Sequence, residues 1–590
     1  MEQHTQKAND LKLSQERYWH LLLHMVDGVS EIDDSAFFFA ADGKTNAKHE
    51  LEATLDAFFN ESRFDDNASA CRFPARKAWL QKSLEIEDFP DVKCSEYDAT
   101  VERLAPKSVT LVFPSAHINS PASMFGHTFL RINSRYNSKL LAYAINYAAN
   151  ADPDKENATV FAIKGLFGGY FGKYSLLPYY EKLKEYRDAE QRDIWEYDLN
   201  LNEEETLAMV RHIWELNGTE SNYYFFTENC SYNMLWLMEV ARPNVHLREH
   251  FHYEVIPLET VHATRAEGLI SSENYRASKR TILLRYEELI NEKNITLVQA
   301  LIDETVTSQE LLDNKELEKQ QKMYILEAAV EFLEYSYSKN SMSKEKYLDL
   351  FHTFTKTRAS LGEGELLTLK TPHNPVESHR AIRLKGGFGY REGEPIGFVG
   401  LRPAYHDLKD SSLGFLRGTQ IEFLDFLLSY NEEEELKIED ATILSIVSLA
   451  QRSEFFHSFS WRVKLGWDRD YLKESANFST SVGAGLSFGN KDAYFYFMLD
   501  PLFYMNQGFV GGIGGSAGIV IDKYDFMQTN LELTKRYYDG GKEQSIVACT
   551  QSFRLSQNLQ VQLKYDYKER EEKKTYSAEQ TAQLSLNYYF

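Results

Sequence analysis

The sequence predicts two main parts, an α+β domain behind a helical N-terminal region and a C-terminal antiparallel transmembrane β-barrel of about twelve strands. Helical and strand-like segments mix in the first half of the chain, and a charged helical stretch follows them. Beyond Thr371-Pro372-His373-Asn374-Pro375 the apolar period changes to two. We therefore expect a helical region at 1–100, the α+β domain at 101–282, a helical connector at 283–375 and the barrel at 376–590.

The composition supports a folded protein with a barrel. At 590 residues the chain is too long for one ordinary domain, and 43% apolar residues are enough for folded cores. The 36 Tyr and 37 Phe are more typical of a β-barrel than of a helical membrane protein. No stretch approaches the roughly 18 apolar residues of a transmembrane helix. The net charge of -23 argues against nucleic-acid binding and does not favour adhesion to anionic lipid.

The N-terminal segment and the cysteines indicate whether the protein is exported. Residues 1–30 lack the apolar core of a signal peptide, so we expect that a signal was removed if the barrel is exported. Cys71 and Cys94 bracket a short loop that a disulfide could close in an oxidising compartment; alternatively, they are two unrelated buried thiols. No group of residues has zinc-ligand spacing, and we expect neither a metal nor a cofactor.

A strand hairpin is expected to present the first candidate site residues. After the helical stretch Leu11–Phe59, strands are predicted at 109–113, 128–132 and 140–147, with a polar loop at 114–123 and a turn at 133–139. A turn centred near Tyr136 places Asn146, within about one residue, opposite His127. An amide beside an imidazole fixes the tautomer of a general base. The alternative is that Asn146 is an ordinary polar residue at a strand end.

The second candidate lies where a helix is predicted to begin. The polar run Thr227-Glu228-Asn229 precedes an apolar helical pattern, so Cys230 falls in the first turn. The helix dipole there favours the thiolate and lowers the thiol pKa from about 8.5. A lone cysteine on an apolar helix more often serves packing, but its polar neighbours favour the edge of a cleft. Upstream, 203–216 is predicted to be helical, and the glycine-rich stretch 165–172 to be an apolar lid or a buried turn.

Alternating apolar and polar residues predict the barrel. The pattern is clear in 459–467, 480–488, 559–567 and 582–590, as in strands that cross an outer membrane. Short turns are expected near 489–491, 521–523 and 555–557, with longer loops at 468–474, 536–542 and 569–574. A soluble β-sandwich is the alternative, but the inward Arg462, Lys464, Lys564 and Asp566 would be hard to bury in its core. An even strand number would place the start of the barrel, and the domain before it, in the periplasm.

These residues together suit acyl transfer through cysteine. That chemistry needs a thiolate, a base, a group that orients the base, and donors for an oxyanion. We assign Cys230 as the nucleophile, His127 as the base and Asn146 as the orienting residue. The backbone N–H of Cys230 is a candidate oxyanion donor.

Four segments carry a family resemblance. PSAHINSPASMFGHTFLRIN, YAINYAA, GLFGGYFGKYS and FFTENCSYNMLWLME resemble the DUF4105 family, which includes the Lnb-type bacterial lipoprotein N-acyltransferases. Histidine before cysteine is also similar to the order in circularly permuted papain-like domains, which are related to NlpC/P60 and include the lecithin:retinol acyltransferase group. The resemblance covers roughly Arg72 to Pro243, outside the barrel.

The resemblance implies a substrate pair. Cys230 would take an acyl chain from a phospholipid as a thioester and pass it to the α-amino group of a lipoprotein's N-terminal diacylglyceryl cysteine. That activity does not require a fused barrel, so the acyl acceptor of a barrel-containing protein could be a different molecule. Two other hypotheses remain. In one the site is a cysteine hydrolase (phospholipase, amidase or peptidase); in the other the protein is a non-catalytic outer-membrane assembly or transport protein with a structural Cys230.

Overall fold

The computed structural model divides the chain into two compact units, Met1–Ser278 and Lys279–Phe590, which are described separately. It describes residues 2–63, 65–87, 89–90, 92–115, 125–136, 141–150, 164–165, 168–339, 341–431, 436–505, 508–572 and 575–590. Most of the expected loop at 114–123, part of the expected turn at 133–139, and residues 166–167 of the glycine-rich stretch lie outside this range.

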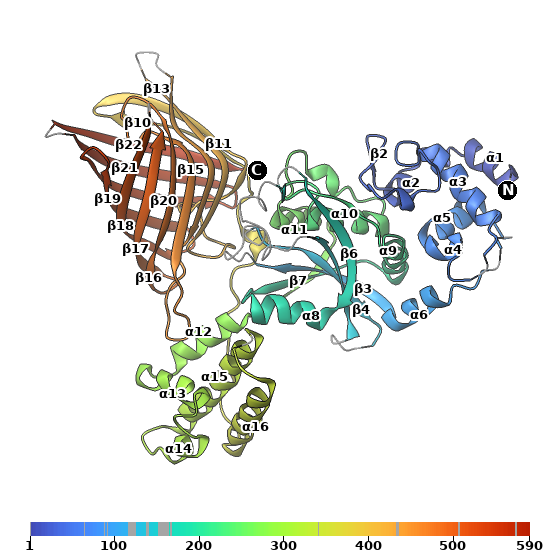
Figure 1. Ribbon diagram of the computed structural model, residues 1–590, viewed down its shortest axis with the longest axis horizontal. Helices are drawn as coiled ribbons and strands as arrows, with labels where there is room; N and C mark the ends of the chain where they lie inside the picture. The colour runs from blue at the N-terminus through green and yellow to red at the C-terminus, as the bar shows by residue number, and fades with distance from the viewer. Residues whose placement is uncertain are drawn as a thin grey trace. The chain divides into compact units, whose positions relative to one another are not determined.

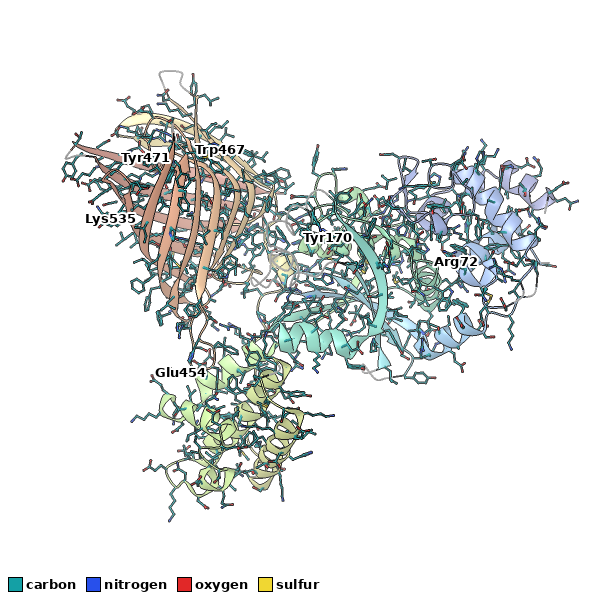
Figure 2. The ribbon with its side chains drawn as sticks, viewed as in Figure 1. Arg72, Tyr170, Glu454, Trp467, Tyr471 and Lys535 are labelled. Atoms are coloured by element: carbon teal, nitrogen blue, oxygen red, sulfur yellow. A yellow bond between two sulfur atoms is a disulfide. The ribbon has the colours of Figure 1, made fainter. Side chains whose placement is uncertain are left out.

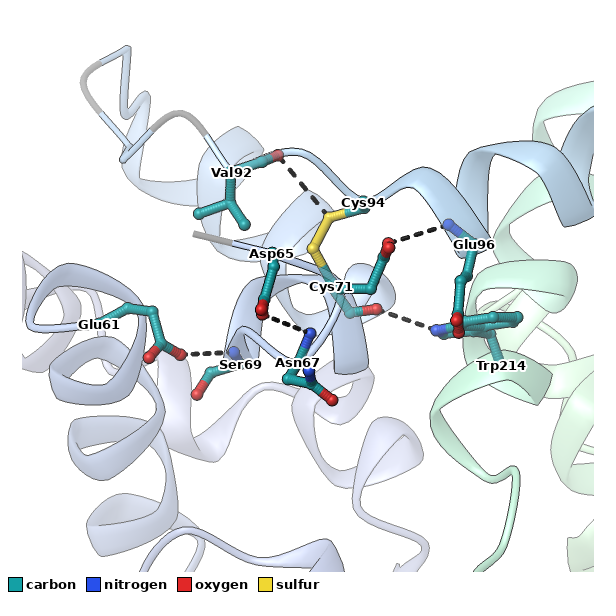
Figure 3. The surroundings of a disulfide bond; sticks show 10 residues. Glu61, Asp65, Asn67, Ser69, Cys71, Val92, Cys94, Glu96 and Trp214 are labelled. Carbon is teal, nitrogen blue, oxygen red and sulfur yellow. Dashed lines mark hydrogen bonds between the residues drawn. A yellow bond between two sulfur atoms is a disulfide. The ribbon is translucent and has the colours of Figure 1, made fainter. Parts of the chain in front are cut away.

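The N-terminal region of the first unit is mostly helical, as predicted. Its elements are α1 (Glu2–Asp10), η1 (Leu13–Gln15), α2 (Arg17–Leu22), β1 (Met25–Val26), β2 (Val29–Ser30), η2 (Ser35–Phe37), α3 (Ala47–Phe59), α4 (Ser69–Arg72), α5 (Pro74–Leu84) and α6 (Ser95–Leu104). A disulfide joins Cys71 in α4 to Cys94 at the start of α6 (Figure 3). Trp214 Nε1 donates to the backbone oxygen of Cys71 at 2.9 Å and connects this segment to the following domain.

The rest of this unit surrounds a seven-stranded antiparallel sheet with the order β8-β6-β5-β4-β3-β7-β9. Figure 1 labels β3, β4, β6 and β7 of this sheet. Its strands are β3 (Pro106–Pro114), β4 (Phe129–Ser134), β5 (Tyr143–Ala149), β6 (Tyr170–Pro178), β7 (Ile194–Leu199), β8 (Ser221–Tyr223) and β9 (Ile270–Arg276). The helices are α8 (Tyr179–Leu183), the π-helix η5 (Lys184–Ala189), α9 (Glu203–Glu215), α10 (Cys230–Ala241), η6 (Arg248–His250) and α11 (Pro257–Ala266). Helix α10 packs against β4 and β5, while α9 and α11 pack against β3.

Two details of this sheet differ from the sequence-based expectation. The pairing of Leu130 with Ile145 in the β4–β5 hairpin places Asn146 across from Phe129, not from His127, because the paired residues are centred one to two positions beyond Tyr136. The second difference concerns the glycine-rich stretch. From Tyr170 onward it is strand β6 and not a lid, and Gly172 lies so close to the ring of Tyr147 that a Cβ there would clash.

The second unit begins with five helices, in the region predicted to be a helical connector. They are α12 (Lys279–Leu289), α13 (Glu292–Ile302), α14 (Ser308–Asp313), α15 (Lys319–Ser338) and α16 (Lys344–Ser360). The buried ammonium of Lys279 pairs with Glu331 at 2.5 Å and also with Glu334, which fastens α12 to α15. Within the described residues, no helix is both long enough and apolar enough to cross a membrane.

A closed twelve-stranded antiparallel barrel follows the short turn η7 (Pro375–Glu377). Its strands pair in chain order, and closure comes from the pairs β10–β22 and β11–β13. The strands are β10 (Arg383–Arg391), β11 (Glu394–Arg402), β13 (Thr419–Asn431), β14 (Leu436–Ser448), β15 (Ser460–Asp468), β16 (Asn477–Gly489), β17 (Ala493–Met505), β18 (Phe509–Tyr524), β19 (Met527–Tyr538), β20 (Lys542–Ser556), β21 (Leu559–Glu572) and β22 (Thr575–Tyr589); β12 (Ala404–His406) is a short extra strand beside β13. The barrel prediction is confirmed.

The barrel wall is apolar outside and polar inside. In β17, Phe497 and Leu499 point outward and are 55% and 64% exposed, whereas the intervening Met498 points inward and is 2% exposed. The inward Arg462 donates to Asp500 at 2.6 Å, so its charge is paired within the lumen. This arrangement excludes the soluble β-sandwich, because an apolar outer belt around a polar interior is suited to lipid.

Segments fold into the barrel at both ends, which the sequence did not indicate. At the end where β10 begins and β22 ends, the plug segment Ala404–Gly418 enters the lumen. There Ser412 donates to Asp522 at 2.5 Å, and the carbonyl of Lys409 accepts from Gln560 at 2.8 Å. At the other end the 469–476 loop turns inward, and its Asp470 accepts from Lys568 at 2.6 Å; Figure 2 labels Tyr471 of this loop.

The expected loop lengths are partly wrong. The turns at 490–492, 525–526 and 557–558 are short, and 469–476 is a longer loop, all as predicted. The connections expected to be long at 536–542 and 569–574 have only three and two residues between strands, because β19 to β22 continue farther than the alternation suggested. At the end of the barrel where β10 begins and β22 ends, the connections 403–418 and 449–459 are long.

Candidate functional site

Helix α10 begins at Cys230, as predicted from the polar run before it. Asn229 is its N-cap, and the side-chain oxygen of this residue accepts from the N–H groups of Ser231 and Tyr232 at 3.0 and 3.2 Å. The Asn229 amide also donates to the carbonyls of Phe225 and Val255 at 3.0 and 2.6 Å, which fixes the loop ahead of the helix. Cys230 is therefore held in the first helical turn, where the helix dipole stabilises a thiolate. Its side chain is buried, with 6% exposure.

His127 lies near this thiol and comes from the turn that leads into β4. It lies two residues before β4 and follows Gly126, which has φ +87°. A Cβ at Gly126 would come within 2.7 Å of the Phe113 ring, so only glycine fits this turn beside β3. The glycine in the Phe125-Gly126-His127 motif therefore has a structural reason: it lets the chain bend so that the imidazole enters the site.

The three predicted site residues come together. His127 Nε2 donates to Asn146 Oδ1 at 2.7 Å, and His127 lies close enough to Cys230 for each side chain to shift the pKa of the other. Because Nε2 is occupied by the amide, Nδ1 is the ring nitrogen left for the thiol. The register error in the predicted hairpin does not separate the pair, since His127 and Phe129 are two residues apart and their side chains lie on the same face. The imidazole reaches Asn146 along the diagonal.

The electrostatics favour a thiolate–imidazolium pair. Burial by itself would raise the pKa of the Cys230 thiol, but the charge and hydrogen bond of His127, with hydrogen bonds from Ser231 and the Thr128 N–H, lower this pKa from 9.0 to about 7. Burial would likewise lower the pKa of His127, but Cys230 and the hydrogen bond to Asn146 raise it above the ordinary 6.5. The two pKa values move in the directions that suit an activated nucleophile and its base.

Tyr223 is a site residue that the sequence analysis missed. The N–H of Cys230, the candidate oxyanion donor, donates to the Tyr223 hydroxyl at 3.3 Å, and this hydroxyl also lies against the Cys230 side chain. Burial and the neighbouring Cys230 hold the pKa of Tyr223 well above 10.0, so the phenol stays protonated and can donate. The run Tyr223-Tyr224-Phe225-Phe226 gave no signal that distinguished this tyrosine from its neighbours.

A second layer supports His127, and it too was not predicted. The ring of Tyr186 lies 5.6 Å from the imidazole, centroid to centroid, at an interplanar angle of 32°. The guanidinium of Arg192 lies 5.2 Å from the Tyr186 ring and pairs with Glu190 at 2.8 Å. These residues come from η5 and the turn after it, far from His127 in sequence, so periodicity could not reveal them. Within the described residues of this unit, no group of histidine, cysteine and carboxylate side chains converges as metal ligands.

Comparisons with known families divide the chain into four consecutive matches. A family described as "Lnb N-terminal periplasmic domain" matches residues 96–266, which hold all three predicted site residues. Three families described as domains of unknown function match the rest: DUF7843 at 11–83, DUF7842 at 273–366 and DUF7840 at 372–589. A search of curated proteins found no match.

Solved structures that are similar to this chain include porins and other outer-membrane proteins, and the alignments cover about a third of the chain. The NanC porin has 11% identity and a TM-score of 0.25, and the alignment covers 36% of this chain and 100% of that one. The KdgM porin in complex with disordered oligogalacturonate has 10% identity and a TM-score of 0.23, with 35% and 99% covered. OmpT of Vibrio cholerae has 10% identity and a TM-score of 0.19, with 36% and 96% covered.

The location of the protein follows from its two parts. The chain carries an Lnb-type N-terminal periplasmic domain, by its family match, and a closed barrel with an apolar outer face. It is an outer-membrane protein with a periplasmic domain.

Proposed function

We propose that the protein is a cysteine acyltransferase that moves an acyl chain from a phospholipid, through a Cys230 thioester, to an amine such as a lipoprotein N-terminus. The observation that carries the proposal is the placement of His127, which is hydrogen-bonded to Asn146 and lowers the pKa of the Cys230 thiol at the start of α10. The family match at 96–266 supports it, as does the permuted papain-like order of the residues.

The first half-reaction forms the thioester. The Cys230 thiolate attacks the ester carbonyl of the phospholipid, and the Tyr223 hydroxyl, which accepts a hydrogen bond from the N–H of Cys230, would donate one to the oxyanion. When the tetrahedral intermediate collapses, the C–O bond breaks and the imidazolium of His127 gives its proton to the departing lysophospholipid oxygen. Asn146 keeps the His127 ring in one tautomer throughout.

The second half-reaction returns the enzyme to its starting state. A neutral amine attacks the thioester carbonyl, His127 removes a proton from the attacking nitrogen, and the C–S bond breaks to release the amide. Because the thiolate leaves as a stabilised anion with a pKa of about 7, it is a good leaving group. A water molecule in place of the amine would give hydrolysis at the same site.

Intact-mass spectrometry tests the proposal. The full chain in detergent is incubated with a phospholipid of defined acyl chains, and a mass increase of one acyl group is expected. Hydroxylamine should remove this adduct, and Cys230→Ala should not form it, whereas Cys549→Ser, which removes the other free cysteine, should form it normally. An acyl adduct that persists in Cys230→Ala would refute the assignment of Cys230 as the nucleophile.

A second measurement decides between acyl transfer and hydrolysis. The acylated protein is isolated and mixed with a peptide that bears an N-terminal diacylglyceryl cysteine, or with buffer alone. Acyl transfer predicts rapid loss of the adduct with peptide, together with an N-acylated product, and slow loss in buffer. Equal rates of loss with free fatty acid as the product would identify a hydrolase.

A further inference from the structure

Two buried histidines and a buried aspartate lie together inside the barrel, at the end where β10 begins and β22 ends. His379 precedes β10, His406 ends β12, and Asp410 lies in the plug segment Ala404–Gly418. All three are buried, with 3%, 4% and 0% exposure. His379 lies in the segment that leads into β10, and His406 and Asp410 lie in the plug segment, so the three side chains bring these two segments together.

The distances between their polar atoms match a tetrahedral metal site. His379 Nε2 lies 3.2 Å from His406 Nδ1 and 3.7 Å from Asp410 Oδ2, and the three atoms all lie within 4.8 Å of one another. Two ligands of a tetrahedral zinc ion, with bonds of about 2.0–2.1 Å, stand about 3.3–3.4 Å apart. Two imidazoles and one carboxylate, with a fourth position for water, are a common ligand set for zinc.

The outer contacts orient these groups as metal ligands are oriented. His379 Nδ1 donates to the carbonyl of Arg380 at 2.7 Å, which leaves the lone pair of Nε2 directed at the site. Asp410 is positioned by the Tyr589 hydroxyl at 2.7 Å and by Arg402 at 2.7 Å. Such hydrogen bonds to the ligands fix the tautomer of a ligating histidine and the orientation of a ligating carboxylate.

The charges around these groups are paired within the lumen. Ion pairs link four carboxylates to three cations; these are Asp407, Asp410, Glu422 and Asp425 with Arg383, Arg402 and Lys409. Lys385 also lies near Asp407 and Asp425, so the carboxylates and the cations of this group are equal in number. A metal ion here would be held by the two imidazoles and Asp410, and not by an excess of negative charge.

We propose that His379, His406 and Asp410 bind one divalent transition-metal ion, with zinc the best match, and that this ion fastens the plug segment inside the barrel. The proposal is independent of the Cys230 chemistry. The ion would join His379, which precedes β10, to His406 and Asp410 of the plug segment, so its binding energy would stabilise the plug.

Metal content is the direct test. The full chain, purified in detergent without a polyhistidine tag, is stripped with EDTA, loaded with zinc sulfate, desalted and measured by mass spectrometry of the metal. We expect close to one zinc per chain, and a loss of affinity of at least about tenfold in His406→Gln. His373→Gln is the matched control, because this exposed histidine contacts Glu377 and Asp525 at 3.1 and 3.2 Å and reports adventitious surface binding; it should leave the stoichiometry unchanged.

A spectroscopic measurement keeps the test independent of how the variant folds. Cobalt(II) added to the stripped wild-type protein should produce the strong visible bands of a tetrahedral ion, and excess zinc should remove them. Wild-type protein without these bands would overturn the proposal. So would zinc binding that is equal in wild type and in a folded His406→Gln protein, because the two imidazoles would then share only a hydrogen bond.

Discussion

Removing the His127 imidazole should slow alkylation of Cys230 by a calculable factor. The experiment compares the parent with His127→Ala, both in a Cys549→Ser background, so that Cys230 is the free thiol that is followed. In the parent, His127 holds the pKa of the thiol near 7. Without the imidazole, burial remains and returns this pKa to near the ordinary 9.0.

The magnitude follows from two opposing effects. At pH 7 a thiol of pKa 7 is about half thiolate, whereas one of pKa 9 is about 1% thiolate, a ratio of about 50. A less basic thiolate is also a weaker nucleophile, and a Brønsted slope of about 0.45 over two pKa units reduces the advantage about eightfold. The parent should therefore react at least about six times faster than His127→Ala at pH 7.

Iodoacetamide labelling across pH 5–10 measures both the rate and the titration. The parent should show an apparent pKa near 7, and His127→Ala should show one of about 9 or higher. His246→Ala is the matched control, because this exposed histidine of the same unit pairs with Glu249 and should leave the rate unchanged. Equal rates in the parent and in His127→Ala, or an apparent pKa near 9 in the parent, would refute the assigned pair.

Four further outcomes are expected. Asn146→Ala removes a hydrogen bond to a charged imidazole and should slow acyl-adduct formation about 10- to 100-fold, while an unchanged rate would exclude an orienting role. Burial, Glu31 and Asp33 raise the pKa of Glu228 to about 7, so ionisation of this carboxyl lowers stability as pH rises toward and past that value. In thermal unfolding, Glu228→Gln should stabilise the first unit by up to about 3 kcal/mol at pH 8 but by less than about 1 kcal/mol at pH 5. Equal gains at both pH values would contradict this sign. Loss of the Cys71–Cys94 disulfide should cost about 3 kcal/mol in urea unfolding, from the 23-residue separation of the two cysteines, and no change under reductant would contradict it. Shortening the plug segment should raise single-channel conductance several-fold in planar bilayers, and a parent that already conducts equally well would show that the plug does not block the lumen.

The barrel wall was predictable because each strand obeys a local rule. Alternation in segments such as 559–567 depends only on which side of the wall a residue faces, and the structure confirms it in β21. The plug segment was not predictable, because its position depends on polar contacts between residues far apart in the chain. The bond from Ser412 to Asp522 spans 110 residues, and neither side chain differs in type from those of an ordinary polar loop.

The candidate site shows the same division. Helix capping indicated the start of α10 at Cys230, and an approximate hairpin brought Asn146 near His127 although its register was wrong. This tolerance arises because side chains two residues apart on one strand face lie within reach of the same partner. Tyr223 and Tyr186 were missed because they reach the site through tertiary packing, from segments whose local sequence has no feature specific to this chemistry.

The burial of Cys230 bears on the choice between amine and water. At 6% exposure, with Tyr223 hydrogen-bonded to its N–H and Tyr186 packed on its base, the thiol lies in surroundings that few water molecules can enter. A thioester formed there is protected from hydrolysis as long as the site stays closed. The apolar chains of an amine acceptor would exclude other water molecules from the site while the amine reacts. A water molecule that acts as the acceptor would not do so. If the proposed transfer operates, replacing Tyr186 with a smaller side chain should raise hydrolysis of the isolated acyl adduct more than transfer to the peptide.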